Sequence, residues 1–241
     1  MATRRSYASY DDGCAAAHAL DIVGERWSLL VVRELVLGPK RFTDLRHGVP
    51  GASANVLAQR LRELEDDGVV RRRTLGPPSG ANVYELTDWG LQLEGVLQVL
   101  GRWGTLSPSM PHGASVGVDT IVVSMRTMLP ASGVPANLQL RLQLDLGRDS
   151  FRIVAAEGAV TMERGECSSP DAVVGTDPNT LDRVVFYGAA LQAAVDDGTL
   201  RIQGDRGAVE RFLALFPQLT PAADVAPGQD ERSPEAEDRA S

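Results

Sequence analysis

The sequence predicts two folded regions of different class, a mainly helical first half that contains one β-hairpin and an α+β second half. Three observations support this division. At 241 residues the chain has room for two cores of about 100 residues each. Apolar residues recur at helical spacing through most of residues 1–104, whereas strict apolar and polar alternation begins at residue 137. Residues 104–117 are rich in Gly, Pro and Ser, which is typical of a linker.

Apolar spacing and turn residues place the elements of the first half. Residues 27–37 are apolar nearly all round, which indicates a buried helix, and turn residues at 48–51 follow a brief helix. Ser53 is a good N-cap for the next helix. The predicted helices begin near residues 14, 27, 42, 53 and 88, and the last of them runs to residue 103 with a broad apolar face. The predicted strands of the hairpin are residues 69–75 and 83–86.

The second half alternates strands with helices. Residues 137–146 alternate strictly between apolar and polar, so this strand buries one face. The predicted strands are residues 137–146, 150–155, 159–164, 172–176 and 199–203, and the predicted helices are residues 121–129, 180–187, 189–195 and 208–216. The predicted domains are therefore residues 1–104, a linker at 105–117, an α+β domain at 118–219 and a disordered acidic tail at 220–241.

The net charge of −8 is distributed unevenly. Residues 1–104 hold 13 basic and 13 acidic residues, whereas residues 105–241 hold 11 basic and 19 acidic residues. Basic residues also cluster within the first half, at Lys40 with Arg41 and at Arg71 to Arg73. Because phosphate binding depends on local positive charge, the overall acidity does not exclude a nucleic-acid partner.

Several protein classes find no support in the sequence. No apolar run approaches the roughly 20 residues needed to cross a bilayer, and the first ten residues lack a secretory signal, so we expect a cytoplasmic protein without membrane contact. Two distant cysteines do not form a disulfide framework. The three histidines have no partner at metal-ligand spacing, and no nucleophile and base pair is recognisable. We therefore expect no metal, no cofactor and no enzymatic activity.

A short helix, a tight turn, a capped helix and a basic hairpin, in that order, form the sequence pattern of a winged helix-turn-helix. Its recognition helix needs one face packed on the domain and the other free to enter the major groove of DNA. Leu57, Leu61 and Leu64 form the packed stripe, at a step of about 100° per residue. The opposite side carries the predicted base contacts, Asn55, Gln59 and Arg62. The predicted phosphate contacts are Lys40, Arg41, Ser53, Arg60, Arg71, Arg72 and Arg73.

Residues 12–104 resemble the HxlR-type winged-helix regulators. The motifs that carry the resemblance are Cys14, ALDIVGERW at 19–27, GPKRFTDL at 38–45, LAQRLRELE at 57–65 and YELT at 84–87. The resemblance implies a homodimer that binds inverted repeats of double-stranded DNA in promoters, most simply as a repressor. Some members sense oxidants or electrophiles through a cysteine at the position of Cys14. Proximity to a helix N-terminus would favour its thiolate, and the alternative is an inert thiol.

Residues 138–216 resemble a sterol-carrier-protein type of lipid-binding fold. The motifs are GAVTMERG at 158–165, GTDP at 175–178 and DGTLRIQGD at 197–205. The resemblance implies a curved sheet backed by helices around an apolar cavity for a hydrophobic small molecule. Its candidate lining residues are Leu140, Leu142, Leu144, Phe151, Ile153 and Val184. The alternative is that these side chains simply fill a core.

The sequence therefore favours a dimeric, DNA-binding transcription regulator that responds to a hydrophobic molecule bound in its second half. One alternative is a lipid carrier in which the first half serves protein contacts. Another is a redox-sensing regulator that uses Cys14. The polar helix face and the run from Arg71 to Arg73 favour DNA binding, because a carrier has no need for them.

Overall fold

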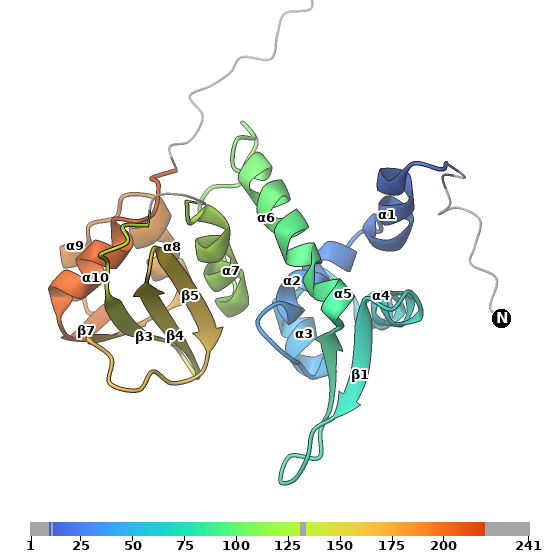
Figure 1. Ribbon diagram of the computed structural model, residues 1–241, viewed down its shortest axis with the longest axis horizontal. Coiled ribbons are helices and arrows are strands. Elements are labelled where there is room, and N and C mark those ends of the chain that lie inside the picture. The colour runs from blue at the N-terminus through green and yellow to red at the C-terminus, as the bar shows by residue number, and fades with distance from the viewer. Residues whose placement is uncertain (1–9, 11, 131–133, 220–241) are drawn as a thin grey trace, which may run out of the picture.

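The computed structural model describes residues 10, 12–130 and 134–219, and the predicted disordered tail at 220–241 lies outside these residues. A mainly helical N-terminal part lies beside a C-terminal part that is built on a five-stranded sheet (Figure 1). Helices α6 (Leu93–Gly104) and α7 (Val118–Met128) meet where the two parts join. Among the described residues, no helix is long and apolar enough to cross a membrane.

The N-terminal part follows the predicted order of elements. Its remaining helices and strands are α1 (Ala15–Val23), α2 (Ser28–Leu35), α3 (Phe42–Gly48), α4 (Ala54–Asp66), β1 (Val70–Thr74), β2 (Asn82–Leu86) and α5 (Asp88–Leu91). The single helix expected over residues 88–103 is two helices, α5 and α6, which are separated at Gln92.

Helix α4 forms as its sequence predicts. The Ser53 hydroxyl caps it by accepting a hydrogen bond of 3.3 Å from the amide of Val56. Leu57, Leu61 and Leu64 are each at most 1% exposed, which confirms the buried stripe. The hairpin of β1 and β2 follows directly, with the two strands antiparallel.

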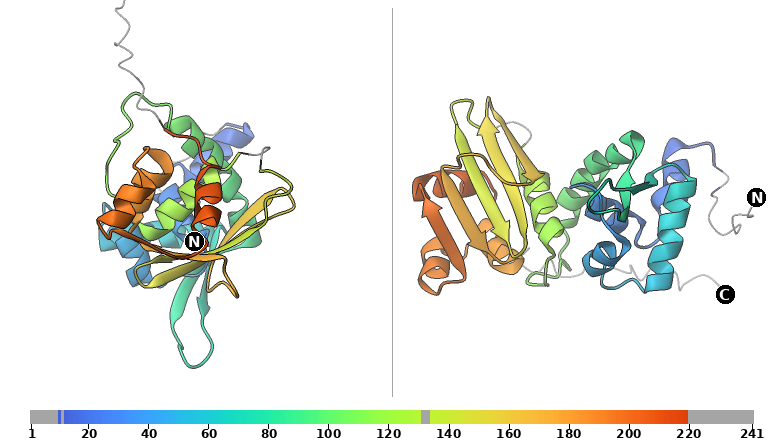
Figure 2. Two further views of the ribbon diagram at one scale, coloured as in Figure 1. Left: turned by 90° about the vertical axis from the view of Figure 1, so that its left-hand side faces the viewer. Right: turned by 90° about the horizontal axis from the view of Figure 1, so that it is seen from below.

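The C-terminal part is an α+β unit. Its elements after α7 are β3 (Leu140–Leu146), β4 (Asp149–Ala156), β5 (Ala159–Arg164), β6 (Ala172–Thr176), α8 (Pro178–Phe186), α9 (Leu191–Asp196), β7 (Leu200–Gly204) and α10 (Arg206–Leu213). The strand order is β5-β4-β3-β6-β7, and β3 pairs with β6 in parallel. Helices lie along one face of the sheet (Figure 2). The predicted alternation is confirmed because Leu140, Leu142, Leu144 and Leu146 are all buried.

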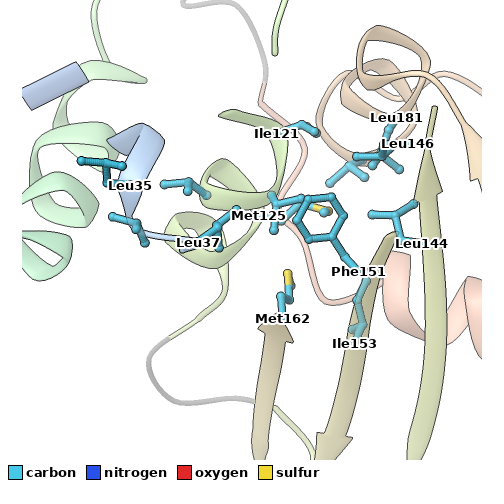
Figure 3. Packing of buried hydrophobic residues seen from close by; sticks show 14 of the residues in the cluster. Leu35, Leu37, Ile121, Met125, Leu144, Leu146, Phe151, Ile153, Met162 and Leu181 are labelled. Atoms are coloured by element: carbon cyan, nitrogen blue, oxygen red, sulfur yellow. The ribbon is translucent and has the colours of Figure 1, made fainter. Parts of the chain in front are cut away.

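Helix α7 joins the two parts through a shared core. Ile121, Val122 and Met125 of this helix are completely buried. Figure 3 shows Met125 between Leu37 of the N-terminal part and Phe151 of the sheet. One continuous set of apolar contacts therefore runs from the helix-turn-helix into the sheet. A movement of α7 would change the packing of both parts.

The six candidate pocket residues occupy this core. All of them are buried, and the cavity between the sheet and helices α8 to α10 measures about 20 Å³. Ligand pockets are usually at least about 300 Å³. Among the residues that the structure describes, Leu142, Leu144 and Ile153 line this small cavity, and Leu140, Phe151 and Val184 are also buried. The six side chains thus fill a core here, because the helices pack directly on the apolar face of the sheet.

The segment expected to be a linker makes contacts of its own. The amide of Val116 donates a hydrogen bond of 2.9 Å to Oδ1 of Asn179, at the start of α8. Nδ1 of His112 lies 3.4 Å from the hydroxyl of Tyr187, at the end of the same helix. The segment that connects the two parts thus contacts both ends of α8.

Candidate nucleic-acid interface

The face of α4 opposite its leucine stripe is exposed and polar. Asn55, Gln59 and Arg62 all lie on it, as predicted. Arg62 donates a hydrogen bond of 2.7 Å from Nη2 to Oε1 of Gln59, whose Nε2 donates one of 2.6 Å to Glu63. These exposed bonds hold the side chains along the helix surface, and base edges could replace them at little cost. The geometry suits a helix that enters a groove.

Val56 is an interface candidate that the sequence reasoning missed. Its side chain is 39% exposed, next to Asn55 on the open side of α4. An exposed apolar residue on a groove-facing helix can contact the methyl group of thymine. The same helical step that selected Asn55 also places Val56 off the leucine stripe, so the signal was present in the sequence.

The hairpin presents positive charge on both of its faces. Arg71 and Arg73 lie on the side of Glu85, at 2.8 Å and 3.0 Å from its carboxylate oxygens. Arg72 lies on the other side, with its guanidinium 5.1 Å from the ring centre of Tyr84 and a hydrogen bond of 2.8 Å to the hydroxyl. Two of the three arginines thus share the carboxylate of Glu85, and Arg72 contacts Tyr84 instead. The hairpin keeps a net positive charge and holds its guanidinium groups in defined positions.

Two further predicted phosphate contacts are also accessible. Arg41 is exposed and donates a hydrogen bond of 3.1 Å to the hydroxyl of Ser79 in the hairpin loop. Ser53 is exposed at the N-terminus of α4, where its hydroxyl hydrogen remains free to donate while its oxygen caps the helix. Backbone atoms of Lys40 and Tyr84 pair at 2.8 Å and 2.9 Å, which ties the start of α3 to β2.

Lys40 and Arg60 occupy different positions from those expected. The Lys40 ammonium lies 2.7 Å from Glu34 and 2.8 Å from Asp119, and its side chain is only 15% exposed. Arg60 is 14% exposed and lies 2.7 Å from Glu63. Their charges are neutralised within the chain, so we do not retain either residue as a phosphate contact. Asp119, the second partner of Lys40, comes from the other part of the chain, and local sequence does not reveal it.

Lys40 belongs to a network of buried charges, which we call the Glu34–Asp119 network. Glu34, 2% exposed, accepts hydrogen bonds from Arg33 and Lys40. Arg33 also donates a bond of 3.2 Å to the carbonyl of Gly48, at the end of α3. A Cβ at Gly48 would lie 2.0 Å from the Glu34 carboxylate, so only glycine allows this approach. The network therefore holds both ends of α3 against α2.

Asp119 extends the network into the C-terminal part. This aspartate of α7 is 4% exposed and pairs with Lys40 and with Arg164 of β5. Arg164 in turn lies 2.5 Å from Asp149 at the start of β4. A continuous chain of charges thus connects the helix-turn-helix to the sheet. Sequence analysis missed it, because its members are distant along the chain.

Cys14 lies immediately before α1 and is exposed, whereas Cys167 is buried. The backbone N–H groups of Ala17 and Ala16 lower the pKa of the Cys14 thiol below its ordinary value. Its position at the start of a helix therefore favours the reactive thiolate. Among the residues that the structure describes, no group of three or more His, Cys, Asp and Glu side chains could hold a metal ion.

An exposed apolar stripe runs along α5 and α6. Trp103 is 71% exposed and Val99 is 65% exposed. Exposed apolar stripes of this kind are typical of surfaces that pack against another subunit. The other exposed apolar residues of this stripe are Trp89, Leu91, Val96, Leu100 and, just beyond α6, Leu106.

Comparisons with known proteins identify the N-terminal part. Residues 22–110 match the HxlR-like helix-turn-helix family. The HTH-type transcriptional regulator YtcD of Bacillus subtilis is 33% identical over 99 residues, which cover 41% of this chain and 79% of YtcD. The HTH-type transcriptional regulator YodB of the same organism is 36% identical over 85 residues, which cover 35% of this chain and 76% of YodB. A solved structure of quinone-bound YodB superposes with a TM-score of 0.32 and 34% identity, over 36% of this chain and 92% of that one.

Proposed function

The chain belongs to the HxlR-like helix-turn-helix family, and from this premise we propose that it is a sequence-specific transcription regulator, most simply a repressor, that binds double-stranded DNA. The observation that carries the proposal is the polar, exposed face of α4 over a fully buried leucine stripe, beside a hairpin with three arginines and one carboxylate. Helix α4 acts as the recognition helix in the major groove, and the β1–β2 hairpin acts as the wing.

The interface residues divide by chemistry. Asn55 and Gln59 offer amide groups that pair with adenine, and the guanidinium of Arg62 pairs with guanine. Arg41, Ser53, Arg71, Arg72 and Arg73 contact phosphates, which fixes the position of the protein on DNA without reading sequence. Val56 adds an apolar contact to a thymine methyl group.

A homodimer fits the exposed stripe of α5 and α6. Two copies that cover this stripe would place two α4 helices about 34 Å apart, one turn of DNA, on an inverted repeat. In this arrangement residues 1–104 are the DNA-binding domain and residues 118–219 a regulatory domain, joined by residues 105–117. A hydrophobic effector would act by separating helices α8 to α10 from the sheet. Helix α7 and the Glu34–Asp119 network would carry that change to α3.

The test compares two arginine variants on DNA. Operator sequences are first selected from a random duplex pool by the purified chain. Arg62→Ala is expected to weaken operator binding by about 1–3 kcal/mol and to relax the preference at one base pair. Arg72→Ala is expected to weaken binding to operator and random duplexes equally and to reduce the salt dependence of binding. Arg152→Ala, an exposed arginine on the sheet, is the control. Equal losses for Arg62→Ala on operator and random DNA would remove Arg62 from the base contacts.

A redox-responsive regulator is the second candidate, favoured by the exposed Cys14 and its lowered pKa. YodB, a relative of this chain, has been solved with quinone bound. In this proposal the Cys14 thiolate adds to a ring carbon of a quinone, the electron pair of the attacked C=C bond moves to a carbonyl oxygen, and that oxygen takes up a proton from water. The bound adduct then changes DNA affinity. The test is operator binding before and after treatment with a quinone. Unchanged affinity of a fully modified protein would reject it. The lipid-carrier alternative has less support, since the cavity of about 20 Å³ holds no lipid.

A further inference from the structure

Arg148 is a highly exposed charged residue at the junction of the two parts. It occupies the two-residue turn between β3 and β4, and its side chain is 83% exposed. The preceding Gly147 has φ +67°, which lets the turn close tightly, and Leu146 pairs with Asp149 directly below it. The strand pairing below the turn fixes the backbone of Arg148, and its long side chain extends into solvent.

This turn lies against α3. Nη2 of Arg148 is 3.7 Å from Oδ1 of Asp44, in the first turn of α3. The two parts enclose a cleft of about 560 Å³, with Arg41 and His47 on the α3 side and Arg148 on the sheet side. Arg148 therefore stands beside the residues that connect α3 to the proposed wing.

The Glu34–Asp119 network holds the turn in this place. Asp119 binds Lys40 next to α3 and also Arg164, whose guanidinium lies 2.5 Å from Asp149. Asp149 directly follows Arg148 in the chain. Because Asp119 at the centre of these contacts is 4% exposed and has a partner on each side, the contacts fix the distance from the turn to α3.

The most accessible charged side chains at the rim of the cleft are Arg41 and Arg148, opposed by Asp44. Glu34 and Asp119 are buried and Asp149 is paired with Arg164, so their charges are balanced internally. Asp44 is the one more accessible carboxylate among the described lining residues, at 39% exposure of its side chain. An ion pair at this distance and exposure is worth little, so Arg148 remains available.

The positions of the two parts indicate which stretch of a bound duplex would lie near Arg148. The C-terminal part and α4 lie on opposite sides of the N-terminal part in two perpendicular views (Figures 1 and 2). A duplex bound at α4 and the hairpin that ran on past α3 would come to the β3–β4 turn, because Arg148 lies beside Asp44 of α3. A single guanidinium on an exposed turn suits a phosphate and gives no readout of base edges.

We propose that Arg148 contacts a DNA phosphate on the flank of each half-site, so that the C-terminal part extends the DNA interface. This inference rests on the proposed function. Its partner is the backbone of double-stranded DNA, independent of sequence. The contact lengthens the stretch of duplex that each protomer covers.

The experiment measures binding of the full chain to two duplexes. The short one holds two half-sites in about 20 base pairs, and the long one adds about 10 base pairs, one helical turn, on each side. On the long duplex, Arg148→Ala is expected to lower the slope of log K against log salt by about 1.8, for two phosphates per dimer. Between roughly 50 and 200 mM salt the unaltered chain should then lose about tenfold more affinity than the variant.

Three controls test whether the lost salt dependence belongs to Arg148 and to the flanking DNA. Arg152→Ala removes an equal charge from the same sheet, outside the cleft, and should keep the slope of the unaltered chain. Arg148→Lys should restore most of the slope, and the short duplex should show no difference. Equal slopes for Arg148→Ala and Arg152→Ala on the long duplex would overturn the inference, as would an equal loss on the short duplex. Loss of binding in Arg62→Ala and Arg72→Ala would still support the proposed function.

Discussion

Asp119→Asn should uncouple the two parts of the chain. The change keeps the size of the side chain and removes its charge from the centre of the Glu34–Asp119 network. Asp119 is 4% exposed and is the one described residue that joins Lys40 to Arg164 through its side chain. The apolar packing of α7 and the ion pair between Arg126 of α7 and Glu94 of α6 also join the two parts, and the substitution leaves both in place.

The size of the effect follows from the partners that remain. Removing one member of a buried ion pair costs about 3–5 kcal/mol when the other is left without a partner. Here Lys40 keeps Glu34 at 2.7 Å, and Arg164 keeps Asp149 at 2.5 Å. The loss is therefore closer to that of one charged hydrogen bond, about 2 kcal/mol. For a folded unit of this size we expect the melting temperature to fall by about 4–8 °C.

Tryptophan fluorescence and circular dichroism distinguish uncoupling from general destabilisation. Trp27, Trp89 and Trp103 all lie in the N-terminal part, so fluorescence reports that part alone. Far-ultraviolet circular dichroism reports both parts. In the unaltered chain the two urea transitions should coincide, whereas in Asp119→Asn the fluorescence transition should separate from the dichroism transition.

Glu163→Gln is the matched control, because it removes an exposed carboxylate that pairs with Arg152 on the sheet surface. Exposed pairs contribute about 0–1 kcal/mol, so this variant should behave like the unaltered chain. If Asp119→Asn melts within error of Glu163→Gln and its two transitions still coincide, the network does not couple the two parts.

Three further predictions address the dimer, the thiol and a helix cap. Trp103→Glu places a charge in the exposed apolar stripe and should shift the chain from dimer to monomer in sedimentation at micromolar concentration; a dimer of unchanged affinity would place the interface elsewhere. Cys14 should react with iodoacetamide at a lower pH than an ordinary thiol and faster than buried Cys167, and Cys14→Ser should abolish the fast phase; equal rates for both thiols would contradict this. Asp177→Ala should cost about 1 kcal/mol at neutral pH, since this carboxylate caps α8. Burial raises the pKa of Asp177, but hydrogen bonds from Thr180 and Asn179 outweigh it and lower the pKa, so the stabilisation is present above pH 3.8 and is lost as pH falls through the folded-state pKa; a pH-independent difference in urea unfolding would refute it.

Local sequence was sufficient for the elements of the candidate interface. The spacing of Leu57, Leu61 and Leu64 determines which side of α4 is buried, and therefore which side exposes Asn55, Gln59 and Arg62. Caps and turns also depend on neighbours in sequence, so Ser53 and the hairpin form where predicted. The same holds for the strict alternation of β3. These features depend on contacts between residues a few positions apart, or on the spacing of apolar residues along a single helix or strand.

Only the tertiary structure decided which charges remain available. Lys40 resembles a surface lysine in sequence, yet it is paired with Glu34 and also with Asp119 from the other part of the chain. Arg148 lies in an acidic half of the sequence, yet the fold places it beside α3. The apolar face of the sheet suited either a cavity or a filled core, and the packing of helices on it leaves about 20 Å³. In each case the deciding partner is distant along the chain, and the strength of a charge or the size of a cavity depends on what surrounds it in space.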